Sequence, residues 1–192
     1  MAEWPASLTH RVGTFAAQHH LAAALERRWQ GLDAAAAEAL ADLAEELRLG
    51  ENHLRDVLEW CEEIALRDGG GIAEILHSPP LRTARTRELG RNDAVKAVRE
   101  ALRRLRFPRL VATEETLARK VRALRLPPEV RLVLPANLQD GTLRVEIRAA
   151  ELTVLREAAE ALRTSLARPE MTELFALLSG DFEEGEIRDA SE

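Results

Sequence analysis

The side chains most able to do chemistry are a single cysteine and five histidines. Cys61 could act as a nucleophile if a histidine lay within hydrogen-bonding distance of its thiol. The histidine in the same predicted helix is His53, and eight residues of helix separate the two by about 12 Å. We therefore interpret Cys61 as a buried core thiol and predict no catalytic residue.

The histidines near the N-terminus could hold a metal ion only if they shared one helical face, usually with a carboxylate. His19 and His20 are adjacent in the sequence, so they point in different directions on a helix. His10 lies on the same predicted helix but forms no His-x-x-x-His pair with either of them. The glycines at 69–71 lack the lysine of a phosphate-binding loop. We predict neither a metal site nor a cofactor.

Charge is segregated along the 192 residues, whose formal net charge is −6. Residues 1–81 carry 6 basic and 14 acidic side chains, residues 82–131 carry 15 and 6, and residues 132–192 carry 6 and 13. A basic stretch therefore lies between two acidic ones. It could pair with protein carboxylates, or it could bind nucleic acid.

Cations recur along the predicted helix 93–106 with the spacing of one helical face. Such a face would bind a polyanion with a salt-dependent affinity. However, the stretch offers one aromatic residue for stacking, and the connection after it is longer than the turn of a helix-turn-helix. We favour protein carboxylates as the counterions. The candidate contacts for an anionic partner or nucleic acid are Lys96, Arg99, Arg103, Arg104, Arg106, Arg109, Arg119, Lys120 and Arg122.

Hydrophobic periodicity predicts a mainly α protein of the α+β class, with an N-terminal helical bundle followed by a helix–β-hairpin–helix unit. Apolar residues at spacings of three and four predict three helices, over 8–29, 36–47 and 54–65. Asp33 can cap the start of the second of these helices. Prolines after residue 78 indicate a linker. The predicted division is an acidic unit at 1–78, a linker at 79–92, a second unit at 93–178 and a disordered acidic tail at 179–192.

The apolar pattern changes from the helical period to strict alternation in residues 130–134 and 143–148, which predicts two strands with one apolar face. Because a two-stranded sheet is rarely stable alone, a helix or a partner must cover this face. The following helix carries leucines at a/d spacing, which could cover the hairpin or pair with a second copy. The candidate self-association residues are Leu143, Val145, Ile147, Leu152, Leu155, Leu162 and Leu166.

The succession of helix, two strands and helix from about residue 113 to 166 is similar in topology to small dimerisation modules. We predict a non-enzymatic protein-interaction module, an adaptor or accessory subunit of a larger cytoplasmic assembly. The alternative is a nucleic-acid-binding accessory protein that uses the helix 93–106 and the helix after it. A protein partner or self-association is expected. No apolar run approaches the roughly 20 residues of a membrane span, so we expect no membrane contact.

Overall fold

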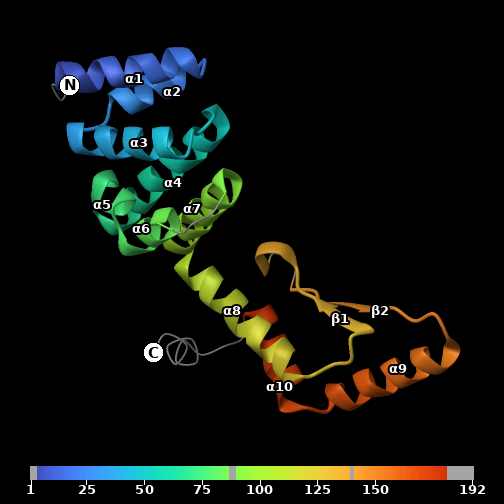
Figure 1. The fold of residues 1–192 in the computed structure, drawn as a ribbon. Coiled ribbons are helices and arrows are strands. Elements are labelled where there is room, and N and C mark those ends of the chain that lie inside the picture. The colour runs from blue at the N-terminus through green and yellow to red at the C-terminus, as the bar shows by residue number, and fades with distance from the viewer. Residues whose placement is uncertain (1–3, 87–89, 139–140, 181–192) are drawn as a thin grey trace. The chain divides into compact units, whose positions relative to one another are not determined.

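The computed structural model describes residues 4–86, 90–138 and 141–180. They form a mainly helical protein with one antiparallel hairpin, which confirms the predicted fold class (Figure 1). The chain divides into two compact units, Met1–Phe107 and Pro108–Glu192. The elements are α1 (Ala6–Gln18), α2 (Ala23–Gln30), α3 (Ala34–Glu46), α4 (Glu51–Asp68), α5 (Ile72–Leu76), α6 (Pro79–Thr86), α7 (Arg91–Arg106), α8 (Pro108–Ala123), β1 (Val130–Val133), the 3-10 turn η1 (Ala136–Leu138), β2 (Arg144–Ile147), α9 (Leu152–Leu166) and α10 (Pro169–Ser179).

The N-terminal unit is a stack of helices around one apolar core. Helix α1 packs on α3, α5 packs on α3 and α4, and α7 packs on α4 and α6 (Figure 1). Trp29 is fully buried, and its ring meets that of Phe15 edge-on at a centroid distance of 5.7 Å. The indole Nε1 donates a hydrogen bond to the carbonyl of Ala37 at 3.2 Å. The largest core side chain thus has its one polar group satisfied.

The helix predicted over residues 8–29 is two helices in the structure. Helix α1 ends at Gln18 and α2 begins at Ala23, and His20 between them has a left-handed backbone with φ of 51°. The break redirects the chain so that the apolar residues on both sides of it reach the same core. The predicted start of the next helix is confirmed, since Asp33 accepts a hydrogen bond from the Ala36 amide at 2.9 Å.

Residues 79–86, which we assigned to a linker, form helix α6. Pro79 and Pro80 stand in its first turn, where a missing N–H costs no helical hydrogen bond. Leu81 is fully buried and Ala84 nearly so, both in the N-terminal core. Helix α7 belongs to the same core, so the structure divides the chain after Phe107 and not within 79–92. Residues 87–89 of the predicted linker lie outside the described residues.

The C-terminal unit contains the predicted hairpin, whose register pairs Leu132 with Val145. The sequence left two roles open for α9, as the cover of this sheet or as a surface for a second copy. In the structure α9 contacts β2 and α10, but its leucines Leu152, Leu155 and Leu166 stay exposed. The core of the unit is made by Leu117 of α8, Leu132 of β1 and Leu174 of α10. Helix α10 packs on α8, and together they cover β1. Of the predicted tail at 179–192, residues 181–192 lie outside the described residues.

We expect a fragment of residues 1–107 to unfold in one cooperative thermal transition and a fragment of residues 1–78 to lack it. The shorter fragment exposes the core surface that Leu81, Val98 and Leu102 cover in the whole unit. In the longer fragment, Leu102→Ala should lower the free energy of unfolding by about 2 to 5 kcal/mol. Circular dichroism at 222 nm measures both effects. Equally cooperative melting of the two fragments would contradict this division of the chain.

Candidate functional site

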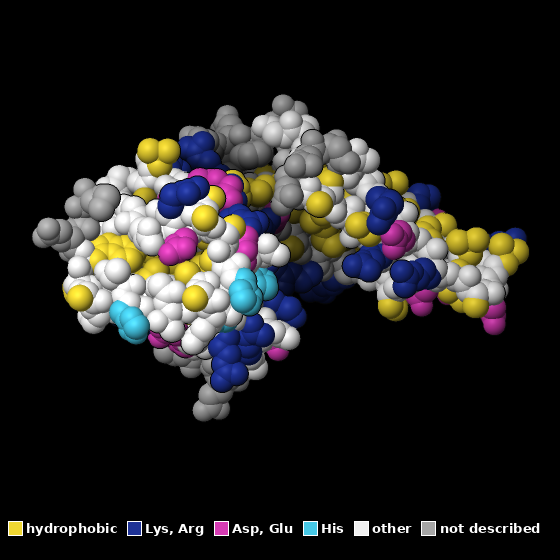
Figure 2. Space-filling view, turned by 90° about the horizontal axis from the view of Figure 1, so that it is seen from above, with side chains coloured by type: hydrophobic (Ala, Val, Ile, Leu, Met, Phe, Trp, Pro, Cys, Tyr) yellow, Lys and Arg dark blue, Asp and Glu magenta, His cyan; other side chains and the backbone are white. Residues whose placement is uncertain are grey.

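The C-terminal unit exposes large apolar side chains on one helix. The exposed fraction is 61% for Leu152, 42% for Leu155 and 58% for Leu166. Along the 15 residues of α9, the buried side chains are Ala158 and Ser165. Figure 2 shows hydrophobic side chains at the surface at the right of the view, where Figure 1 places the hairpin and α9. A helix with an unburied apolar stripe is incomplete as a packed element.

Strand β2 also exposes an apolar side chain. Cross-strand partners lie on one face of a sheet, so Val145 shares a face with buried Leu132, and Ile147 shares it with buried Val130. Val145 is nevertheless 40% exposed. On this face, Leu132 is buried in the core that α8 and α10 help to form, whereas Val145 opposite it is left exposed. We call Val145, Leu152, Leu155 and Leu166 the open apolar surface.

The outer edge of β2 has unpaired backbone groups. The amide of Arg148 donates to the carbonyl of Glu129 at 2.9 Å, so the backbone of that residue faces β1. Since strand residues alternate in direction, the backbone groups of Val145 and Ile147 face the other way. The sheet of the described residues has two strands, so no strand pairs with this edge. An open edge next to an apolar face favours strand addition.

Three other predicted self-association residues are less exposed than the open apolar surface. Leu143 is half-buried and packs against the core of the C-terminal unit. Ile147 and Leu162 are also half-buried. Sequence reasoning missed Phe175 on α10, which is 47% exposed. Its signal was the apolar run Leu174–Leu178, which is wider than one helical stripe and so must leave a side chain outside the core.

The basic residues of α7 face carboxylates of α4 within the N-terminal unit. Arg99 pairs with Asp56 at 2.8 Å, and the Arg106 guanidinium donates to Glu63 at 2.8 Å. Helix α4 comes from the acidic stretch of the sequence and α7 from the basic one. The charge segregation along the chain is therefore partly neutralised by folding.

Trp60 of α4 lies between these two arginines. The guanidinium carbon of Arg99 is 5.4 Å from its ring centroid, and that of Arg106 is 5.5 Å away. Arg106 also lies 4.6 Å from the ring centroid of Phe107. These distances are in the range of cation–π attraction. Sequence reasoning did not link Trp60 to the basic stretch, because more than 30 residues separate them.

The remaining candidate anion contacts also have interaction partners. Lys96 pairs with Asp93 at 3.3 Å, Arg104 pairs with Glu100 at 3.3 Å, and Lys120 pairs with Glu173 at 2.6 Å. Two further cations of α8 bond within their own helix, to a Thr116 hydroxyl and the Ala118 carbonyl. These two cations are Arg119 and Arg122. The last two candidate contacts, Arg103 and Arg109, also interact with other groups of the protein.

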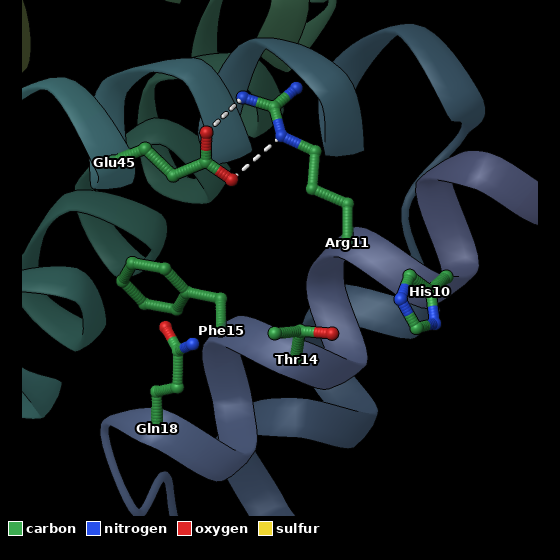
Figure 3. Close-up of a pocket in the computed structure, with 6 residues that line it drawn as sticks. All are labelled: His10, Arg11, Thr14, Phe15, Gln18 and Glu45. Carbon is green, nitrogen blue, oxygen red and sulfur yellow. Dashed lines mark hydrogen bonds and ion pairs between the residues drawn. The ribbon is translucent and has the colours of Figure 1, made fainter.

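A pocket of about 340 Å³ lies on the N-terminal unit beside an ion-pair clamp between α1 and α3. Arg11 donates two hydrogen bonds of 2.7 Å to Glu45 (Figure 3). It also donates one of 2.8 Å to Asp42. The hydrogen bonds from Arg11 hold the pKa of Glu45 below its usual range, and those carboxylates raise the pKa of Arg11. Phe15 of the same pocket stacks on His19 with ring centroids 4.1 Å apart. We assign these contacts to helix packing.

Cys61 is fully buried in the N-terminal core. Burial raises the pKa of its thiol to about 12, with a smaller contribution from the charge of Glu62. Because the thiolate is the nucleophilic form, the protonated thiol of Cys61 is unreactive at neutral pH. Within the described residues, no three side chains of His, Cys, Asp or Glu gather as a metal-binding group. No helix of the described chain has the length and apolarity to cross a bilayer.

Comparison of the chain with protein-family models, curated proteins and solved structures finds no match. The open apolar surface and the cations of α7 are thus interpreted from their own geometry.

We expect Cys61 to resist an aromatic disulfide reagent in the folded protein at pH 7 and to react at once in denaturant. Burial both blocks access and keeps the thiol protonated. Absorbance of the released thiolate, with and without guanidinium chloride, measures the reactive fraction. Rapid reaction of the native protein would contradict the burial of this side chain.

Arg11→Met should lower the free energy of unfolding at pH 7 by about 1 kcal/mol or less, because the lost ion pairs are partly exposed. Because the pKa of Glu45 is lowered in the folded state, its ionised form stabilises the fold at every pH above the ordinary pKa of glutamate. This stabilisation is lost as the pH falls through the pKa of the folded protein. The difference between wild type and variant should therefore shrink below about pH 4. Urea titrations at pH 7 and below pH 4 measure this difference in the free energy of unfolding. Arg27→Met, which replaces an exposed arginine, is the control.

Proposed function

We propose that the chain is a non-enzymatic protein-interaction module that pairs with a second copy of itself through β2 and α9. The observation that carries this proposal is the open apolar surface of the C-terminal unit. Burying each of these leucines in an interface is worth about 1.5 to 3 kcal/mol. A 15-residue helix that buries two small side chains has little tertiary support in one chain.

A second copy fits this surface because each part of it is self-complementary. Two-fold pairing brings the same patch of both copies together. The a/d spacing of the α9 leucines lets two such helices interlock. The open edge of β2 can pair with its own counterpart and extend two hairpins into a four-stranded sheet.

The charges on α9 are also compatible with pairing to α9 of a second copy. The side chains beside the leucine stripe carry both signs, as in the ion pair of Arg163 with Glu160 at 2.6 Å. Such mixed charges let two copies of the helix approach without net repulsion. A paired module would present two N-terminal units, which we propose to be the parts that contact other subunits of a cytoplasmic assembly.

The nucleic-acid alternative stays a prediction. An extended polyanion along α7 would have to replace the carboxylates that already neutralise the helix, Asp56 at Arg99 and Glu63 at Arg106. These ion pairs make the self-pairing module the better supported function.

We expect the protein at tens of micromolar to have the mass of two chains in light scattering coupled to gel filtration. Leu155→Glu with Leu166→Glu should yield the mass of one chain, with any loss of helix content confined to α9, because both leucines are exposed in the single chain and α9 has little tertiary support there. Leu66→Glu is the matched control, since Leu66 is 88% exposed on α4 of the other unit and should leave the dimer intact. A wild-type protein with the mass of one chain at this concentration would overturn the proposal.

Val145→Pro separates the contribution of the strand edge from that of α9. The amide of Val145 faces away from β1, so proline removes an edge donor and leaves the hairpin ladder intact. We expect the dissociation constant of the dimer, measured by sedimentation, to rise by about tenfold or more. An unchanged dissociation constant would show that β2 does not pair across the dimer.

A further inference from the structure

A second pocket, separate from the open apolar surface, lies on the N-terminal unit between the first halves of α4 and α7. Its volume is about 360 Å³. Three of its six lining residues carry a permanent positive charge, and a fourth is a histidine. The lining residues are His53, Arg91, Asn92, Val95, Lys96 and Arg99.

The pocket is rich in hydrogen-bond donors, and none of the described residues that line it is a carboxylate. Arg91 uses its Nε to bond the Leu47 carbonyl at 3.0 Å and one Nη2 proton to bond the Arg48 carbonyl at 2.6 Å. A guanidinium has five N–H donors, so three are left for a ligand. The two carbonyl bonds also fix the guanidinium in place. His53 adds an imidazole N–H, and Asn92 adds an amide.

The cations at the other side of the pocket are held loosely by carboxylates outside it. Lys96 is 78% exposed and lies 3.3 Å from Asp93. Arg99 pairs through one Nη2 with Asp56 at 2.8 Å. Each of these pairs is partly exposed to solvent, so each is weak. A multivalent anion in the pocket can therefore compete with the carboxylates for Lys96 and Arg99.

We propose that this pocket binds a compact phosphate-bearing anion. Arg91, Lys96 and Arg99, together with the donor side chains of His53 and Asn92, match the charge and acceptor oxygens of phosphate, and none of the described lining residues is a carboxylate. The site is confined to the start of α7, because the residues of that helix that line the pocket lie between Arg91 and Arg99. The ligand is thus a small phosphate compound or one terminal phosphate group. The proposal is independent of self-pairing, which uses the C-terminal unit.

The test is a titration of the full chain with inorganic pyrophosphate at constant ionic strength, with sodium chloride as the reference anion. Calorimetry should show saturable binding that chloride does not reproduce. Tryptophan emission should change as well, because Arg99 contacts both the pocket and the ring of Trp60. Trp60→Phe should abolish the emission change and leave the calorimetric binding in place.

Charge variants locate the bound anion. Lys96→Ala should weaken binding by about threefold and Arg99→Ala by about tenfold. Arg104→Ala is the matched control, since it removes an exposed cation of α7 that does not line the pocket. Asp56→Asn should act in the opposite direction and tighten binding, because it releases Arg99 and removes a nearby negative charge. A tighter complex cannot be a result of damage to the fold.

The outcomes decide the proposal. Binding that weakens in Lys96→Ala and Arg99→Ala, strengthens in Asp56→Asn and is unaffected in Arg104→Ala supports it. Absence of saturable pyrophosphate binding at millimolar concentration overturns it, and so does equal weakening in Lys96→Ala and Arg104→Ala. A 5′-phosphorylated and an unphosphorylated single-stranded oligonucleotide distinguish the sources of the phosphate. Preference for the phosphorylated form identifies a terminal nucleic-acid phosphate, and binding of pyrophosphate alone identifies a small ligand.

Discussion

The packing of α7 on α4 is the interaction on which the rest of the N-terminal unit depends. Val98 and Leu102 bury the apolar edge of α7, and the cations lie about 100° away around that helix. Seating the apolar edge therefore places Arg99 beside Asp56. Exposed pairs of this kind contribute about 0 to 1 kcal/mol each, so burial supplies the stability. The ion pairs then set the alignment of the helices, and that alignment creates the cationic pocket.

The C-terminal unit is limited by its supply of core side chains. The core that Leu117, Leu132 and Leu174 define uses α8, α10 and β1, which leaves α9 and β2 with little to pack on. A two-stranded sheet and a lone amphipathic helix are both marginal in water. Strand β2 and helix α9 thus both lack apolar packing partners, and the two elements are consecutive in the chain. One partner that offers a strand and an apolar helix would remedy both, and the chain itself has these parts.

Local patterns predicted those elements whose determinants lie within a few residues. Asp33 marked a helix start, and alternation marked both strands, because caps and strand faces are set by nearby side chains. Features that depend on distant packing were missed or misplaced. Pro79 suggested a linker, although proline also suits a first helical turn, and the outcome was decided by the burial of Leu81. The contact of Trp60 with Arg99 joins two helices, and the apolar stripe of α9 could not show that residues of α8 and α10 bury Leu132 of the hairpin.

The burial of Cys61 has a practical consequence for spectroscopy. It is the one cysteine of the sequence, and its thiol is enclosed in the N-terminal core. A second cysteine placed at a solvent-facing position would carry an exposed thiol with an ordinary pKa near 8.5. Maleimide dyes or nitroxide labels would then modify that position selectively, with the native side chain left in place. Single-site labels for energy-transfer or spin-distance measurements could thus be introduced without first removing a residue from the core.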